Sequence, residues 1–420
     1  MSNGSLIMTP SNSNTSNTTN FVNESYYVPH FQPIVNVITR NVSGYEVLGR
    51  QYSPIENKYH SLGALFHSNQ DDILSVYNVD RIIREKAVRY LKESYSKTKL
   101  FFNIMPHYLS RVHKSDLKAD RFHIIQLIEK YEINKSDIIL EITEDEFEGS
   151  IENLIQMVNV FRDYGLKIAI DDLGVGFSNL ERIGYLHPDI IKIDIKIMRE
   201  SLNLNSFRQV LSAVSEMSQK LGSHLLFEGI ETEEELNLAL SMGANLLQGY
   251  YFAKPQQNFL NKNYFAKDLK AILEKFAGLR FIELLQELEK ENSIVQRLEE
   301  IFHDFEQKDK NYIIKKLSEA QDAFPQFISK VFLCDIHGYQ ITATYLRNEY
   351  GKLEERLSGL GNNYAWKPYF IQHKALSIHE KKRWHMTEPL FDIKKQKEYV
   401  VFTYWLTDEI ILVSQVDWKS

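Results

Sequence analysis

The chain has 420 residues, of which 43% are hydrophobic and 25% are charged, so it can build a sizeable core and is long enough for two domains. Its 49 basic and 56 acidic residues give a formal net charge of -7, which offers no global positive field for a long nucleic acid. The one cysteine, Cys334, excludes an intrachain disulfide and a cysteine-cluster zinc site. Because the sequence shows no secretory signal and no apolar run of membrane-spanning length, we expect a soluble cytoplasmic protein.

Composition and hydrophobic patterning divide the chain into four parts. Residues 1–22 are polar low-complexity sequence that cannot bury enough apolar surface to fold, so we expect them to be disordered. Residues 23–258 alternate strand and helix patterns. Residues 259–322 are glycine-poor and amphipathic, and residues 323–420 hold all four tryptophans. We therefore expect a strand–helix domain, a helical connector and a second, α+β domain.

Within residues 23–258 the expected elements follow a regular order. Apolar runs of strand length lie near 31–35, 45–50, 100–104, 138–144, 166–171, 190–194, 225–229 and 246–249. Helices are expected near 73–91, 122–131, 150–164, 205–221 and 233–242. About eight strands alternating with helices favour a TIM-type (β/α)8 barrel over an open sheet.

Polar residues stand at or near the end of nearly every apolar run: Glu46, Asn103, Glu141, Asp171, Asp172, Lys192, Glu228 and Gln248. The chemistry of TIM-type barrels lies at the C-terminal ends of the strands, so these side chains would face a common centre. A single buried polar residue is usually satisfied by a neighbour. That explanation does not predict polar residues at so many successive strand ends.

The adjacent carboxylates Asp171 and Asp172 are followed by a loop containing Gly174 and Gly176. Two neighbouring like charges repel each other, so such a pair is often held by a cation. The alternative is a solvated turn, because Asp and Gly are both common turn residues.

If the polar side chains converge, their oxygens suit hard cations such as Mg²⁺ or Mn²⁺, with Asp172 bridging to a second ion. Lys192 would orient a water or stabilise phosphoryl charge, Glu228 would accept a proton, and Gln248 would hold a water. Arg50, four residues after Glu46, suits a bidentate contact with phosphate. The inferred reaction is phosphodiester hydrolysis by a metal-activated water.

Each of these residues also has a purely structural interpretation. Arg50 and Lys192, taken singly, could be salt-bridge partners. Glu228 could belong to the start of the next helix, for which Thr232 is the expected N-cap and Glu235 its capping-box partner.

The segments resemble the EAL-domain phosphodiesterases, which hydrolyse cyclic di-GMP to linear pGpG. The naming motif reads Glu46-Val47-Leu48, with valine where the family usually has alanine. The other matching blocks are Phe31-Gln-Pro-Ile34, Phe102-Asn-Ile104, Glu141-Ile-Thr-Glu144, Asp171-Asp-Leu-Gly174, Lys192-Ile-Asp194, Glu228-Gly-Ile-Glu-Thr232 and Gln248 to Pro255. The resemblance covers roughly residues 24 to 258 and implies a TIM-like barrel whose first strand is antiparallel.

The resemblance also implies roles for individual residues. The metal positions, for two Mg²⁺ or Mn²⁺ ions, correspond to Glu46, Asn103, Glu141, Asp171 and Asp172. Lys192, Glu228 and Glu46 are assigned to catalysis. Substrate binding is assigned to Arg50, Gln32, Gln248 and Asp194, and Glu144 corresponds to a glutamate that steadies the loop after the Asp pair. The implied ligand is cyclic di-GMP, and the implied assembly is a homodimer.

The departures from the family lie in that loop, at Leu173, Val175, Phe177 and Asn179. They concern regulation and rate more than the metal ligands. A cyclic di-GMP receptor that binds without hydrolysis is therefore the main alternative, and an unrelated metal-dependent barrel hydrolase is a more distant one. No Gly-Gly-Asp/Glu-Glu-Phe segment is present, so no cyclase domain is evident.

Beyond the barrel, the seam-like apolar spacing in residues 259–322 predicts one long amphipathic helix or two, which either dock on the barrel or form a dimerising connector. Hairpin patterns in residues 323–420 weakly resemble a PAS-like or Cache-like sensor module. Its aromatic residues suit a core or a dimer interface better than a ligand box. If this domain senses a small molecule, the sequence does not identify it.

Overall fold

The structure is a computed structural model. It describes residues 24–63, 65, 73–94, 96–104, 119–143, 151–173, 180–303, 308–319, 324–392, 395 and 397–418. The chain divides into two compact units, and the main boundary lies between Ala271 and Ile272. Within the described parts of the chain, no helix combines the length and apolar character needed to cross a bilayer.

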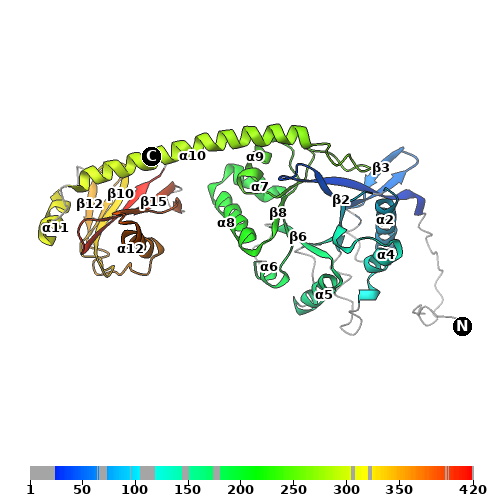
Figure 1. The fold of residues 1–420 in the computed structure, drawn as a ribbon, viewed down its shortest axis with the longest axis horizontal. Helices are drawn as coiled ribbons and strands as arrows, with labels where there is room; N and C mark the ends of the chain where they lie inside the picture. The colour runs from blue at the N-terminus through cyan, green and yellow to red at the C-terminus, as the bar shows by residue number, and fades with distance from the viewer. Residues whose placement is uncertain are drawn as a thin grey trace. The chain divides into compact units, whose positions relative to one another are not determined.

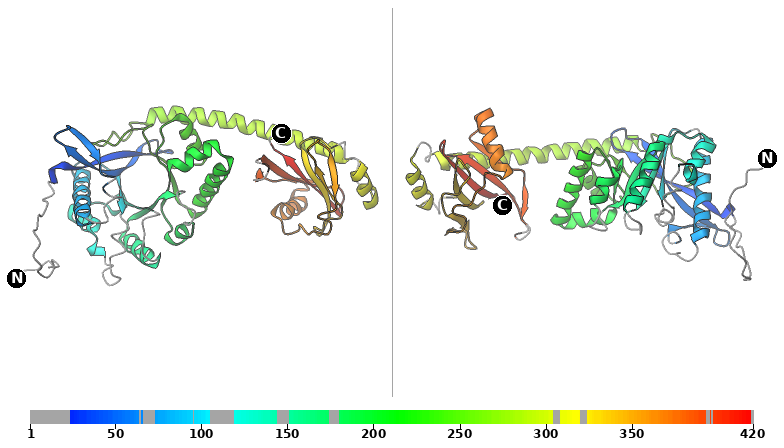
Figure 2. Two further views of the ribbon diagram at one scale, coloured as in Figure 1. Left: turned by 180° about the vertical axis from the view of Figure 1, so that it is seen from behind. Right: turned by 90° about the horizontal axis from the view of Figure 1, so that it is seen from below.

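The first unit is a closed barrel (Figure 2). Its ring consists of β1 (Tyr27–Asn36), β2 (Val42–Ser53), β4 (Lys99–Ile104), β5 (Ile138–Thr143), β6 (Lys167–Leu173), β7 (Ile190–Ile193), β8 (His224–Phe227) and β9 (Leu246–Leu247). Within the ring, β2 and β4 to β9 pair in parallel with their neighbours. β1 closes the ring by pairing antiparallel with both β2 and β9. This confirms the predicted barrel and its antiparallel first strand. One further strand, β3 (Lys58–Ser61), extends β2 as a hairpin outside the ring.

Helices surround the ring of strands (Figures 1 and 2). They are α2 (Ile73–Glu93), α4 (His123–Tyr131), α5 (Ile151–Tyr164), α6 (Leu180–Leu186), α7 (Ile195–Asn203), α8 (Asn205–Leu221) and α9 (Glu233–Ser241). The expected capping box is present at α9, where Thr232 Oγ1 accepts from the Glu235 amide and the Glu235 carboxylate accepts from the Thr232 amide. The sequence patterns missed α7, a short helix that starts directly after β7.

Apolar side chains form one layer inside the barrel: Ile34, Phe101, Ile139, Ala169, Ile190, Leu226 and Leu246. On β2 the residue at this level is Gly44, which pairs with Ile34. A Cβ at Gly44 would lie 2.7 Å from the Phe101 ring, so glycine makes room for that ring. This layer fills the cross-section of the barrel with apolar side chains. The polar residues predicted for the site follow it towards the C-terminal ends of the parallel strands.

The second unit is an antiparallel sheet with helices on both faces. The sheet order is β12-β11-β10-β16-β15-β13, and β14 also pairs with β15. The strands are β10 (Ile328–Asp335), β11 (Thr344–Arg347), β12 (Leu353–Arg356), β13 (Trp384–Met386), β14 (Leu390–Asp392), β15 (Lys397–Trp405) and β16 (Ile410–Asp417), and the helices are α10 (Ala266–His303), α11 (Lys310–Glu319) and α12 (Pro368–Glu380). This architecture confirms the predicted α+β domain.

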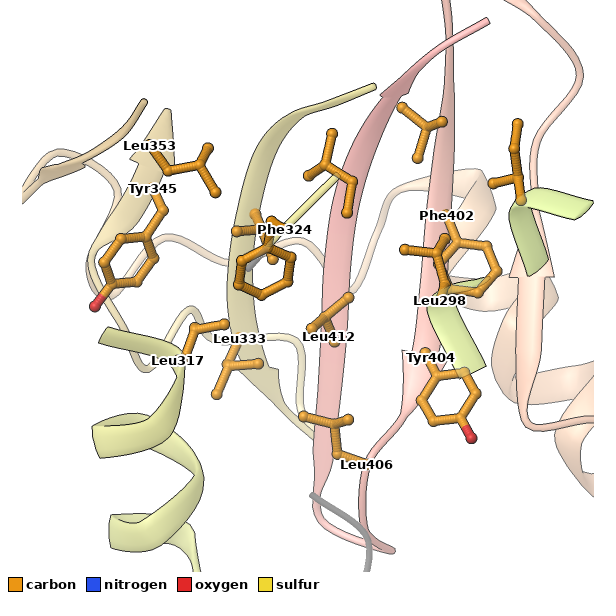
Figure 3. Packing of buried hydrophobic residues seen from close by; sticks show 14 of the residues in the cluster. Leu298, Leu317, Phe324, Leu333, Tyr345, Leu353, Phe402, Tyr404, Leu406 and Leu412 are labelled. Atoms are coloured by element: carbon orange, nitrogen blue, oxygen red, sulfur yellow. The ribbon is translucent and has the colours of Figure 1, made fainter. Parts of the chain in front are cut away.

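The two faces of this sheet have separate cores because side chains alternate along each strand. On one face, Leu333 and Leu412 pack with Leu298 of α10 and Leu317 of α11 (Figure 3). On the other face, Cys334 packs with Phe370 of α12 among other residues. The apolar spacing in residues 259–322 predicted one long helix or two, and the described residues form two, α10 and α11. The sequence patterns did not predict α12.

Candidate active site

Polar residues lie two positions along each parallel strand from the apolar layer. The pairs are Gly44 and Glu46, Phe101 and Asn103, Ile139 and Glu141, Ala169 and Asp171, Ile190 and Lys192, Leu226 and Glu228, and Leu246 and Gln248. On the antiparallel β1 the corresponding residue is Gln32, two positions before Ile34 and directly paired with Glu46. Since side chains alternate with a period of two, this spacing directs polar groups to one end of the barrel interior.

Lys192 is at the centre of the resulting cluster. Its Nζ lies 2.8 Å from Asp171 Oδ2, 3.0 Å from Glu228 Oε2 and 3.1 Å from Glu141 Oε1. The Lys192 side chain is 1% exposed and the Glu141 side chain is 0% exposed, whereas that of Glu228 is 18% exposed. One ammonium group therefore faces three carboxylates in a largely desolvated space.

Glu46 is held by two amides from distant parts of the chain. Asn103 Nδ2 donates to Glu46 Oε1 at 3.1 Å, and Gln248 Nε2 donates to Glu46 Oε2 at 2.5 Å. Both Glu46 and Gln248 are buried. These bonds fix the carboxylate without neutralising it, so the cluster holds more negative than positive charge when its acids are ionised.

The pKa values in the cluster reflect this imbalance. Burial raises the pKa of Glu141 well above its usual value, and Glu46, Asp171 and Glu228 raise it further against the opposing effect of Lys192. Burial raises the pKa of Glu228 to about 8, again opposed by Lys192. Burial alone would lower the pKa of Lys192, but the surrounding carboxylates outweigh it and hold that pKa well above its usual value. The carboxylates around Lys192 therefore favour its protonated, cationic form.

The cluster has buried oxygens of the kind that bind a hard divalent cation, although among the described residues no group of three or more His, Cys, Asp or Glu side chains is arranged to hold a metal ion. Neither carboxylate oxygen of Glu141 accepts a hydrogen bond within the described part of the chain, and its contact with Lys192 is an ion pair only. The Oε1 of Gln248 likewise has no hydrogen-bond partner there. Buried oxygens left without donors are suited to a cation, and carboxylate and amide oxygens are the preferred ligands of Mg²⁺.

Arg50 lies four residues after Glu46 on β2, where an even spacing keeps side chains on the same face of the sheet. Its Nη1 donates to the Gly49 carbonyl at 2.9 Å and lies 3.4 Å from Ser61 Oγ on β3. Burial lowers the pKa of Arg50, while Tyr250 and Glu46 raise it. The guanidinium is thus anchored at the β2–β3 hairpin.

Asp194 has a local structural role. Its Oδ1 accepts from the Lys196 amide at 2.6 Å, which caps the start of α7. The backbone of Asp172 belongs to β6, but its side chain lies outside the described residues, as do Glu144 and residues 174–179 with the altered loop. The roles predicted for these residues stay predictions.

Sequence reasoning missed Arg84, which supports the site from α2. Its Nη2 donates to the Asn103 carbonyl at 2.6 Å, and its Nε lies 2.6 Å from Asp80 Oδ2. Arg84 is 9% exposed. The signal was an acidic and a basic residue four positions apart, beside the apolar residues Val79 and Ile83 of one helix.

Two family models match consecutive parts of this chain. A family model described as the EAL domain matches residues 19–255, and one described as an EAL-domain associated signalling protein domain matches residues 259–419. The chain is 28% identical over 398 residues to the uncharacterized EAL-domain containing protein YkuI of Bacillus subtilis, covering 92% of this chain and 93% of that protein. The crystal structure of YkuI in complex with substrate cyclic di-GMP and calcium has a TM-score of 0.83 and 27% identity, and the match covers 95% of this chain and 98% of that one.

More distant relatives match part of this chain. The probable cyclic di-GMP phosphodiesterase PdeG of Escherichia coli is 30% identical over 235 residues, which are 56% of this chain and 45% of PdeG. The cyclic di-GMP phosphodiesterase RocR of Pseudomonas aeruginosa is 29% identical over 251 residues, which are 57% of this chain and 59% of RocR. These matches cover only part of each relative.

Proposed function

Because this chain belongs to the EAL domain family and carries an EAL-associated signalling domain, we propose that it is a metal-dependent phosphodiesterase that hydrolyses cyclic di-GMP to linear pGpG. The observation that carries this proposal is the buried cluster in which Lys192 faces three carboxylates. The relative named as the cyclic di-GMP phosphodiesterase RocR and the one named as the probable cyclic di-GMP phosphodiesterase PdeG support it, as does the YkuI complex with cyclic di-GMP.

The ligands that we propose for Mg²⁺ or Mn²⁺ are Glu46, Asn103, Glu141, Asp171 and Asp172. When bound, two such ions supply the Lewis acidity that activates a water and offsets phosphate charge. Asn103 now donates to Glu46 through Nδ2, so its Oδ1 is the atom that would serve as a ligand. Gln248 would keep Glu46 oriented by its hydrogen bond.

The remaining roles follow from charge and protonation. The surrounding carboxylates favour the protonated form of Lys192, which suits a cation and hydrogen-bond donor towards water or phosphoryl oxygens. Glu228 is the most exposed of the three carboxylates that pair with Lys192. Burial raises the pKa of Glu228 to about 8, which suits the exchange of a proton near neutral pH. Arg50 binds a substrate phosphate, with Gln32 and Asp194 as further substrate-binding residues. We assign Glu144 to steadying the loop after Asp172.

We further propose that the second unit regulates the barrel and that the protein works as a homodimer. A receptor that binds cyclic di-GMP without hydrolysing it is the second candidate. The altered residues Leu173, Val175, Phe177 and Asn179 favour that candidate, because they stand in the loop after the Asp pair.

The test is hydrolysis of cyclic di-GMP by the full chain with Mg²⁺, with Mn²⁺ and with chelator, following pGpG by chromatography. We expect pGpG with either ion and none with chelator. Binding of cyclic di-GMP without product would establish the receptor function, and absence of binding would contradict both candidates. A competition arm with GMP separates recognition of the cyclic dinucleotide from general anion binding.

A further inference from the structure

The middle of α10 is exposed on every side. Residues 277–289 are all exposed, whereas Leu269 near the start of the helix and Leu298 near its end are buried. The exposed segment nevertheless carries large apolar side chains with exposures between 43% and 62%, namely Leu279, Phe281, Ile282, Leu284, Leu285 and Leu288. Because helices in water gain most of their stability from a packed apolar face, this segment suits a partner.

Some of these side chains form a stripe along one face of the helix. Leu284, Leu285 and Leu288 follow Phe281 by three, four and seven residues, which is the spacing of neighbours on a helical face. We call Phe281, Leu284, Leu285 and Leu288 the α10 stripe. All of its residues belong to the second unit.

Polar residues bound the α10 stripe at both ends. Glu274 lies seven residues before Phe281, at the same heptad position, and Glu291 lies three residues after Leu288. The next apolar residue of this spacing, Val295, belongs to the core of the second unit. The stripe is therefore a separate patch and not the margin of that core.

A second copy of the α10 stripe fits the first when the two helices run antiparallel. In one register, Phe281 packs on Leu284 of the partner subunit and Leu288 packs on Ala277 of the partner subunit. Two-fold symmetry repeats each contact, so these side chains form a continuous apolar seam. The charged residues that bound the stripe stand at the next layers, so the contact ends where the stripe ends.

Gly278 has a role in this pairing. A glycine inside a helix costs up to about 1 kcal/mol relative to alanine. In the single chain a Cβ at Gly278 would meet no atom within 4 Å, so no close packing requires glycine there. In the antiparallel register Gly278 faces Leu285 of the partner subunit. The absent side chain lets the two helices approach and gives that leucine a space to fill.

Charges beside the seam select the direction of the partner helix. Arg280 Nη1 lies 3.4 Å from Glu287 Oε1 of the same chain, and these side chains are 44% and 47% exposed. In the antiparallel register, Arg280 of each copy also stands beside Glu287 of the other copy. In a parallel pair the same two residues would face Leu285 and Asn292 of the partner subunit, so no opposite charges would meet. Charge complementarity therefore favours the antiparallel pair.

We propose that the α10 stripe is the contact surface of a homodimer in which α10 of two chains pair antiparallel. The inference rests on the homodimer proposed above and names its surface and its symmetry. Because the seam is short, we expect a dimer that dissociates at micromolar concentration.

The test is sedimentation velocity of the full chain over a range of micromolar concentrations. The variant is Phe281→Gln with Leu288→Gln, which removes two apolar residues of the stripe and keeps a good helix former at both positions. The matched control is Leu279→Gln with Ile282→Gln, which removes two residues of similar exposure that point away from the seam. Circular dichroism checks the fold, which should persist in both variants because all four side chains are exposed.

We expect the dissociation constant of the dimer to rise at least about tenfold in the stripe variant and to stay unchanged in the control. A wild-type chain that is monomeric throughout the range would overturn this inference together with the proposed homodimer. A dimer that the stripe variant leaves intact would overturn the α10 surface alone. Hydrolysis of cyclic di-GMP is not the readout, so neither result bears on the proposed activity.

A charge exchange tests the antiparallel direction. Glu287→Arg places two arginines side by side at each end of the antiparallel pair, so it should weaken the dimer several-fold at low salt. Adding Arg280→Glu exchanges the two charges and should restore the wild-type dissociation constant. A dimer that is insensitive to Glu287→Arg, or that the second change does not restore, would overturn the antiparallel register.

Discussion

Glu46 and Gln248 are joined by a 2.5 Å hydrogen bond across 202 residues of sequence. The bond links β2, early in the chain, to the residue that follows β9, the last strand of the barrel. β1 lies between these two strands in the ring and pairs with both. Asn103 of the adjacent β4 can hold Glu46 without ring closure, whereas the bond from Gln248 forms only when the barrel closes, so closure completes the orientation of this carboxylate.

The first prediction concerns Glu46. Glu46→Gln should lower metal-dependent hydrolysis of cyclic di-GMP by at least about a hundredfold, because loss of a ligand should exceed the 10- to 100-fold cost of losing an outer-shell partner. The fold should persist, since the two side chains have almost the same volume.

Initial rates with Mn²⁺ and circular dichroism measure the two effects. Glu56→Gln, an exposed change in the β2–β3 turn, is the control, and a folded Glu46→Gln enzyme with wild-type rates would disprove the assignment.

The second prediction concerns Lys192. Lys192→Met removes the cation that pairs with Asp171, Glu141 and Glu228, which should destabilise the metal-free protein by about 3–5 kcal/mol. Adding Mg²⁺ should recover part of that loss, because a bound divalent cation offsets the same carboxylates. Urea unfolding with chelator and with Mg²⁺ measures both quantities.

The control for this experiment is Lys196→Met, which changes an exposed lysine close in sequence. Adding Glu141→Gln to Lys192→Met should restore part of the stability without metal, because it replaces a buried carboxyl group that has lost its cation with a neutral amide. Wild-type stability of Lys192→Met in chelator would mean that the cluster does not carry the charge described for it.

The third prediction concerns acid stability of the second unit. Burial lowers the pKa of His373 to about 4, and its Nε2 lies 3.0 Å from the Arg383 carbonyl. A histidine whose pKa is lowered by folding takes up its proton more readily in the unfolded state. The free energy of unfolding should therefore be constant above the usual histidine pKa of 6.5 and fall as the pH decreases towards 4.

The expected loss from His373 is on the order of 2 kcal/mol between pH 6.5 and about pH 5. His385 nearby has a pKa that is also lowered by burial and by Lys382, so it adds to the same trend. His373→Gln should reduce the pH dependence of chemical unfolding, while His379→Gln, an exposed change on α12, should leave it unchanged. Identical pH dependence in all three proteins would refute this account.

The fourth prediction concerns where the chain can be divided. The start of α10 packs in the first unit, where Leu269 is 1% exposed, whereas Leu298 of α10 and Leu317 of α11 belong to the core of the second. A fragment that ends at Ala271 should therefore fold, and one that ends at residue 323 should expose these apolar faces and aggregate. Light scattering and binding of a hydrophobic dye compare the two fragments. Equal solubility and equal dye binding would show that α10 and α11 do not need the sheet.

Much of the barrel could be predicted because its signals are local. Apolar runs and helical spacings marked nearly every strand and helix, and α8 has the limits expected from the pattern. The missed elements lacked such signals. The nine-residue α7 follows β7 after a single residue, Asp194, and β3 has exposed and half-buried positions only. Periodicity cannot reveal an element that buries little or that has no separating turn.

The sequence by itself determined which residues could take part in the chemistry, because the period of two along each strand fixes the face on which a polar residue stands. Tertiary structure alone decided what those residues do to one another. Lys192 could have been a surface salt-bridge partner, but ring closure places it among Glu141, Asp171 and Glu228. Asp194 stands two residues later and caps a helix. Spacing along a chain carries no information about which strands become neighbours, and pKa values and ion pairs depend on distances between strands.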